Sequence, residues 1–223
     1  MSLRTFALWC CGLAACASAP SGVDAADAAV LRALPPDCQQ AVVVTALPGP
    51  RHAASLSLHE RTDQGWTLVL GPWPAVTGRS GIVAAADKRE GDGGTPAGVH
   101  AVRLAFGYEP VLTTGLAYRQ ATAVDHWVDE PTSPSYNRWV TGKPAVSAER
   151  MRRDDDQYEV GCVLEWNTEA PVPGRGSAIF FHVWSAPTEA TSGCVAVDEA
   201  NARALLARLH VDLNPVFVVG NPE

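Results

Sequence analysis

A cysteine and a histidine near the C-terminus have the residue types and the spacing that nucleophilic chemistry requires. His182 lies in segment 179–184, whose alternation of inward and outward residues is typical of a mostly buried strand. A strand holds a side chain more precisely than a loop does, which suits a base that must meet one partner. Cys194 follows after a short connection. A neighbouring imidazolium can lower a thiol pKa by several units from its usual value of about 8.5. We therefore predict Cys194 as the nucleophile and His182 as its base in an acyl-transfer reaction.

The turn before the cysteine, Thr191-Ser192-Gly193, is the second part of the predicted site. Glycine permits a sharp turn, so the amides of Gly193 and Cys194 could point at one spot and hold the oxyanion of a tetrahedral intermediate. The residues alone leave a structural alternative open. A cysteine on an apolar strand is usually a small buried hydrophobe, and a glycine before it can simply mark a turn.

The segment resembles the signature of the L,D-transpeptidase catalytic domain, the YkuD-like family. That signature has a histidine, a gap of a dozen or more residues, and then Ser/Thr-His-Gly-Cys. His182, Thr191, Gly193 and Cys194 match it, whereas Ser192 stands where many members have histidine.

Other parts of the chain extend this resemblance to about residues 39–220. Segment 88–98 resembles the family's Gly-Asp-x-x-Thr-Pro-x-Gly turn, and segment 128–137 resembles a loop in one branch of the family. Ala196 departs from the family, because many members have an arginine there that holds a substrate carboxylate.

The resemblance implies a mainly β fold with few helices (α+β), a YkuD-like β-sandwich or sheet domain with the catalytic cysteine on a turn after the histidine-bearing strand. It also implies a thioester on Cys194, made from a peptidoglycan stem peptide and resolved by an amine to form a cross-link, with no cofactor. With water as acceptor, the protein would be an L,D-carboxypeptidase or a hydrolase of peptidoglycan links. A non-catalytic wall-binding lipoprotein is the third alternative. Cys194, His182 and His126 match no common zinc site, so no metal is expected.

Residues 1–19 have the pattern of a targeting segment, with a basic start and a short apolar stretch. The sequence before Cys16 resembles a bacterial lipobox, which predicts lipidation of that cysteine. The alternative is ordinary cleavage after residues 17–19. Both processing routes predict export to the bacterial cell envelope. We favour a periplasmic protein that is held by a lipid anchor. We expect a linker over residues 20–37, either a short helix or a tether, and one catalytic domain over residues 38–221.

Composition narrows the classes of partner. The chain has 17 Lys and Arg against 24 Asp and Glu, a formal net charge of −7. Nucleic-acid binding is therefore not expected, since it needs a clustered positive surface. Apart from the proposed N-terminal anchor, no membrane contact is expected. Three cysteines remain after the targeting segment and Cys16, and an odd count in an oxidising compartment suggests one pair. We predict that Cys38 pairs with Cys162 and that Cys194 stays reduced.

Strand patterns dominate the rest of the chain. Strands are predicted over 41–46, 54–61, 66–70, 99–104, 160–166 and 216–219, and an amphipathic helix over 199–209 with Asp198 as its N-cap.

Three further predictions concern surfaces and loops. The irregular segment 125–137 could form a wall of the substrate cleft, with Tyr136, Asn137 and Trp184 in that cleft. The charge run over 150–156 is predicted to be a solvated face, and His59 is predicted to lie on the surface.

Overall fold

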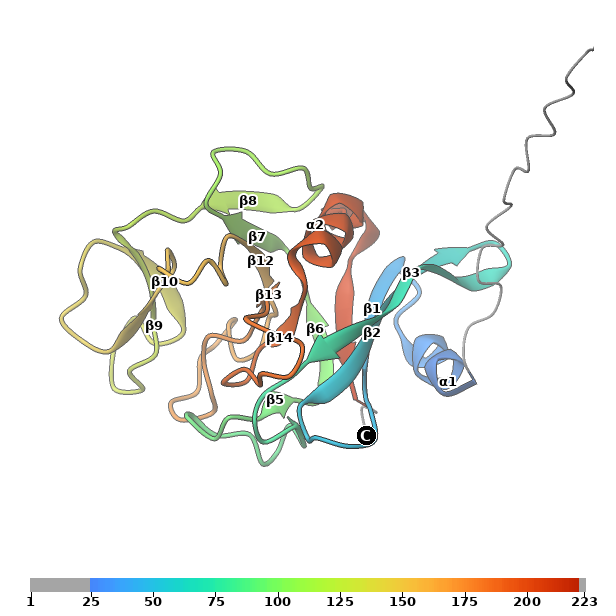
Figure 1. Cartoon of the computed structure of the whole chain (residues 1–223), viewed down its shortest axis with the longest axis horizontal. Coiled ribbons are helices and arrows are strands. Elements are labelled where there is room, and N and C mark those ends of the chain that lie inside the picture. Colours follow the sequence, from blue (N-terminus) through green and yellow to red (C-terminus); the bar gives the residue numbers. More distant parts are fainter. Residues whose placement is uncertain (1–24, 221–223) are drawn as a thin grey trace, which may run out of the picture.

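The structure is a computed structural model that describes residues 25–220, and it confirms the mainly β fold class. Within that range the strands form one large mixed sheet and two small sheets (Figure 1). The large sheet has ten strands in the order β6 (Gly98–Ala101), β15 (Val216–Val219), β1 (Gln40–Ala46), β2 (Ala53–Thr62), β3 (Gly65–Val76), β14 (Val195–Val197), β13 (Phe180–Val183), β12 (Val160–Val163), β7 (Leu104–Gly107) and β8 (Ala117–Gln120).

Three neighbouring pairs in this sheet are parallel, namely β15 with β1, β14 with β13, and β7 with β8. The smaller sheets are β10 (Arg138–Thr141), β9 (Asp125–Val128) and β11 (Ala148–Arg150), and the pair β4 (Ile82–Val83) and β5 (Thr95–Pro96). The helices are α1 (Ala25–Ala33), α2 (Glu199–Arg208) and the short 3₁₀ helix η1 (Val211–Leu213).

The two α-helices cover opposite faces of the large sheet. Along β1, Val42 and Val44 belong to the main core together with α2, whereas Ala41 and Val43 pack in a second cluster with α1. Side chains alternate between the two faces of a strand, so one run of small apolar residues serves both layers. Figure 1 shows α1 and α2 on either side of this part of the sheet.

The helix α1 changes the interpretation of the predicted linker. Leu31 and Leu34 are buried against the sheet, so the second half of segment 20–37 is packed rather than a free tether. The helix also explains why His59 is buried at 1% exposure instead of lying on the surface. Its Nε2 lies 2.9 Å from Ser57 Oγ and 3.4 Å from Asp27 Oδ2 of α1.

The helix α2 supports the strands that carry the predicted site. Asp198 caps its N-terminus by accepting from the Asn201 amide, as the sequence pattern predicted. Its buried residues Ala202, Leu205 and Leu206 pack in the core that includes residues of β12, β13 and β14. Because β13 and β14 are fixed from behind by this helix, the opposite face of the two strands is rigidly presented.

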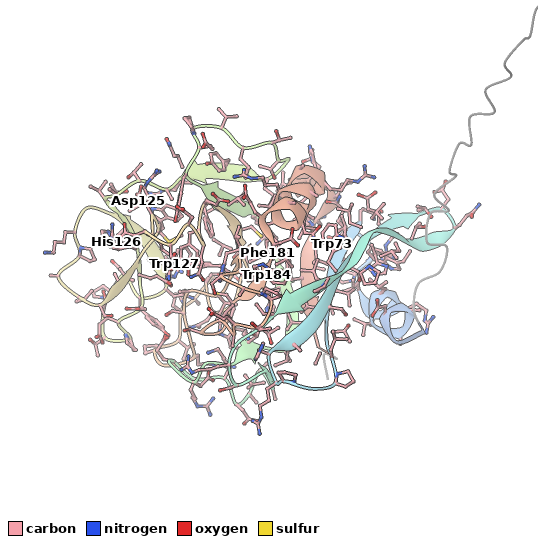
Figure 2. The ribbon with its side chains drawn as sticks, viewed as in Figure 1. Trp73, Asp125, His126, Trp127, Phe181 and Trp184 are labelled. Atoms are coloured by element: carbon pink, nitrogen blue, oxygen red, sulfur yellow. The ribbon has the colours of Figure 1, made fainter. Side chains whose placement is uncertain are left out.

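The small sheet of β9, β10 and β11 packs against that opposite face through aromatic rings. The ring of Phe180 on β13 contacts Trp127 of β9 and Phe106 of β7, with centroids 5.0 and 5.4 Å apart. Figure 2 shows Asp125, His126 and Trp127 on the part of the molecule that carries this sheet, away from Trp73. The small sheet thereby brings β11 and the segment after it close to β13.

Candidate active site

Cys194 ends the turn before β14, and His182 lies on the neighbouring strand β13. The strands are parallel, with Phe181 opposite Val195 and His182 opposite Ala196. Phe181 and Val195 face the main core, and side chains alternate along each strand. Cys194 and His182 therefore emerge from the other face, and both line one cavity.

The backbone of Cys194 is held by two threonine hydroxyls. Thr191 Oγ1 donates to the Cys194 carbonyl at 2.7 Å, and Thr95 Oγ1 donates to it at 3.3 Å. Gly193 has a φ of 143°, and a Cβ there would lie 3.0 Å from the Gly94 carbonyl oxygen, so this position requires glycine. The Gly193 amide donates to Thr191 Oγ1 at 3.1 Å. The sequence predicted that the amides of Gly193 and Cys194 hold an oxyanion. In the structure the Gly193 amide already donates its hydrogen to a side chain of the same turn.

The residue next to this turn also contacts a cation. Ser192 lines the cavity, and its Oγ lies 3.4 Å from Nη1 of Arg79. The same guanidinium donates to the Gly91 carbonyl at 3.0 Å. Ala196 is fully buried in β14 and adds no charge. The positive charge beside the turn therefore comes from a distant part of the sequence.

The Cys194 thiol is buried and protonated in the resting protein. Its sulfur donates to the Ala178 carbonyl and accepts from the Phe180 amide, each at 3.3 Å. Burial, with a smaller contribution from the Glu149 carboxylate, raises its pKa to about 12. The Phe180 amide, Arg153 and Tyr158 act in the opposite direction but do not outweigh burial.

The His182 ring is oriented as a neutral base. Its Nδ1 lies 2.7 Å from the Val183 carbonyl oxygen, which can only accept, so Nδ1 carries the proton and Nε2 keeps its lone pair. Burial lowers the pKa of His182 to about 4, even though the bond to Val183 favours the charged form. A resting pair of thiolate and imidazolium is therefore disfavoured. Both groups are neutral because the low-dielectric surroundings disfavour either charge.

The cavity between these residues and the small sheet has a volume of about 560 Å³. Its charged lining residues are Glu90, Asp129, Glu149 and Glu189 on the acidic side, and Lys88 and Arg153 on the basic side. Lys88 is buried and bonded to Asp92 Oδ1 at 2.7 Å, so its charge is locally neutralised. The cavity is polar and is large enough to admit an extended peptide segment.

The sequence matches the model of the YkuD family, the L,D-transpeptidase catalytic domain, over residues 58–218. The chain belongs to this family. The match spans most of the chain and includes both strands of the candidate site. Membership implies L,D-transpeptidase-type activity on peptidoglycan. No curated protein and no solved structure was found to match the chain.

Three lining residues of this transpeptidase domain were missed from the sequence. Tyr158 donates to Glu149 Oε1 at 2.7 Å, and Arg153 Nη1 lies 3.2 Å from the same carboxylate oxygen. Arg153 belongs to the charge run predicted as a solvated face, but it lines the cavity. The sequence signal for these residues is weak. It consists of Arg153 and Tyr158, which lie five residues apart just before the buried strand β12.

The residues predicted for the substrate cleft do not line the cavity. Tyr136 is buried and donates to Glu90 Oε2, so it supports a lining residue from behind. Asn137 is buried at 1% exposure and bonds to the Ala178 amide at 3.1 Å. Trp184 lies beyond the end of β13, where its amide donates to the Val197 carbonyl. The segment 125–137 does form a wall, but through Asp129.

The predicted disulfide is also wrong, because Cys38 and Cys162 are both free thiols. Cys162 lies on β12 in the main core, whereas Cys38 precedes β1 in the cluster with α1. Strands β2, β3, β14 and β13 separate β1 from β12 in the large sheet. Cys38 instead donates to the Gln40 carbonyl at 3.4 Å.

The predicted targeting segment 1–19 and Cys16 lie outside the described residues. Across residues 25–220, none of the helices combines the length and the apolar character that crossing a bilayer demands. The same part of the chain has no cluster of three or more metal-ligating side chains.

Proposed function

We propose that this protein is a cysteine-dependent L,D-transpeptidase that cross-links peptidoglycan stem peptides through a thioester on Cys194. The observation that carries the proposal is the placement of Cys194 and His182 on one face of two adjacent parallel strands, open to one cavity. Family membership supplies the substrate class.

The acylation half-reaction begins with a neutral pair. His182 Nε2 accepts the thiol proton as the sulfur attacks the carbonyl carbon at the L-centre of a diaminopimelate-type residue. The Cys194 amide stabilises the oxyanion. The carbon–nitrogen bond then breaks, and the terminal D-amino acid leaves with the proton that His182 returns to its nitrogen. A thioester and a neutral imidazole remain.

The second half-reaction consumes the thioester. The amine of a second stem peptide attacks the same carbonyl carbon, with His182 again accepting a proton. The carbon–sulfur bond breaks, the thiolate takes up the proton, and an amide cross-link is formed. Since the burial of Cys194 disfavours a free thiolate, the negative charge on the sulfur needs nearby hydrogen-bond donors while the proton moves in both halves.

The location of this reaction is proposed from the sequence of residues 1–19. We infer export to the bacterial cell envelope and a lipid anchor on Cys16, which would place the domain next to the peptidoglycan in the periplasm. Radiolabelled fatty-acid incorporation that is lost in Cys16→Ala would support the anchor, and equal incorporation in both proteins would exclude it.

Product masses test the reaction itself. Purified protein is incubated with tetrapeptide muropeptides, in parallel with Cys194→Ala, His182→Gln and the control Cys38→Ala. The control removes another buried thiol, one that does not line the cavity. Cross-linked dimers in the wild type and the control, but in neither active-site variant, would support the proposal. Loss of a terminal residue without dimers would indicate a hydrolase, and unchanged substrate would indicate binding alone.

A further inference from the structure

Tyr158 is a buried aromatic residue beside both members of the dyad, and the mechanism above gives it no role. Its side chain is only 3% exposed, and its ring meets the His182 ring edge-on with centroids 5.1 Å apart. Tyr158 and Cys194 belong to one buried cluster and line the same cavity. Hydrogen bonding from the Tyr158 hydroxyl acts to lower the pKa of the Cys194 thiol. A phenol in this position lies beside the sulfur and the imidazole that the proposed reaction uses.

The hydroxyl has one hydrogen and two neighbouring acceptors, the Glu149 carboxylate and the Cys194 sulfur. In the resting protein it donates to Glu149 Oε1 at 2.7 Å. A hydroxyl can donate only one strong hydrogen bond at a time, so a bond to the sulfur must replace the bond to the carboxylate. The sulfur becomes a strong acceptor only after Cys194 has lost its proton.

Glu149 can lose the hydrogen bond from Tyr158 because a second donor contacts its carboxylate. Arg153 Nη1 lies 3.2 Å from the same oxygen, and the Arg153 guanidinium also lies 5.1 Å from the centre of the Tyr158 ring. The other charged groups that bear on this cluster are Asp129, which acts on Glu149, and Asp155, which pairs with Arg153. The carboxylate therefore stays paired when the phenol turns away.

We propose that Tyr158 is a hydrogen-bond donor to the Cys194 thiolate, and that Glu149 accepts the Tyr158 hydrogen bond while the thiol is protonated. When His182 accepts the thiol proton, the Tyr158 O–H rotates from Glu149 to the sulfur. No proton is gained or lost by the phenol or the carboxylate. The catalytic meaning of this step rests on the proposed function, but the step itself is a property of the thiol.

Two substitutions have opposite expected effects on that thiol. Tyr158→Phe removes the donor and keeps the ring, so the thiolate becomes harder to form. Glu149→Gln removes a nearby negative charge and a competing ionic acceptor, so the thiolate becomes easier to form. Tyr118→Phe is the matched control, because its hydroxyl donates to the Glu109 carbonyl and it does not line the cavity.

The experiment measures alkylation of Cys194 by iodoacetamide against pH, using the full chain and peptide mapping by mass spectrometry to separate the cysteines. Tyr158→Phe should move the profile upward by about one pH unit, which is about a tenfold slower reaction at a fixed pH below the thiol pKa. Glu149→Gln should move it downward, and Tyr118→Phe should leave it in place. A Tyr158→Phe protein with unchanged melting and an unmoved profile overturns the proposal.

The double variant tests the shared hydrogen. In the Tyr158→Phe background, Glu149→Gln should lose most of its effect, whereas an undiminished effect would show that Glu149 acts only through space and would overturn the switch. If Tyr158→Phe fails to fold, Glu149→Gln alone serves as the test. An alkylation profile of Glu149→Gln that stays in place or moves to higher pH would then overturn the proposal. The alkylation assay uses no peptidoglycan, so its result does not depend on the proposed reaction. If the alkylation shifts appear as expected but the protein does not turn over muropeptides, the proposed function is overturned and this inference is not.

Discussion

Asn137 should be among the most costly residues to replace, although it does not line the cavity. Its Oδ1 accepts from Trp127 Nε1 at 2.8 Å and from the Ala178 amide at 3.1 Å. Its Nδ2 donates to the carbonyls of Trp166 at 3.0 Å and Asn167 at 2.7 Å. One side chain therefore joins the small sheet to the segment before β13.

Substitution of Asn137 by alanine removes all four hydrogen bonds in a site that is 1% exposed. A buried group left without its partner costs about 1–3 kcal/mol, and partial rearrangement reduces the total, so we expect a loss of about 4 kcal/mol. Asn137 also has a φ of 55°, where alanine adds about 1–2 kcal/mol of backbone strain. The expected total is about 5 kcal/mol, a large part of the stability of an ordinary domain.

Two companion variants separate these causes in urea unfolding at neutral pH. Asn137→Gly loses the same bonds without the strain, so it should be more stable than Asn137→Ala by about 1–2 kcal/mol. Asn137→Asp keeps the acceptor but directs a carboxylate at two carbonyl oxygens, so it should be at least as damaging as alanine. A loss below about 1 kcal/mol in Asn137→Ala would refute the reasoning, because it would mean that the four bonds contribute almost nothing net.

The other predictions concern protonation, capping and the thiols. Because burial lowers the pKa of His182 from 6.5 to about 4, the unfolded chain binds a proton in that interval that the folded chain excludes. The unfolding free energy should thus fall by about 3 kcal/mol as the pH drops from about 6.5 to about 4, and urea titrations of His182→Gln should lack this component. An identical pH dependence in the two proteins would contradict the assigned burial effect. Asp198→Ala should cost about 1 kcal/mol, since it removes the N-cap bond to the Asn201 amide, and an unchanged melting temperature would argue against that cap. Thiol labelling of the denatured, unreduced protein should modify both Cys38 and Cys162, and protection of both would restore the disulfide.

The features that could be predicted from the sequence are those with local causes. The histidine strand, the turn and the cysteine lie within about twenty residues, so one local pattern indicates all three, even though Thr77 and Thr95 of distant segments help to hold the turn. The same is true of α2, whose cap and apolar spacing are contiguous. A short-range pattern was sufficient in each case.

The features that were missed depend on contacts between distant segments. Arg153 lies in a run of charges that looks solvated, and only the packing of the small sheet against β13 turns it toward the cavity. His59 has the alternation of an exposed position, but α1 covers that face of the sheet. The pairing of Cys38 with Cys162 was inferred from a count, and a count carries no information about which core each thiol occupies.

The neutral state of the dyad determines what the rest of the cavity must do. With the pKa of Cys194 at about 12 and that of His182 at about 4, the ion pair is strongly disfavoured before substrate arrives. Negative charge on the sulfur can then develop only if nearby donors stabilise it as the proton moves. The Phe180 amide already donates to the sulfur, and Tyr158 packs in the same buried cluster and acts to lower the pKa of the thiol. Glu149 opposes that charge, so the reactivity of the nucleophile depends on the balance between this carboxylate and the donors. In the proposed mechanism the polar wall formed by the small sheet therefore takes part in the chemistry, and changes there should alter thiol reactivity even when Cys194 and His182 are intact.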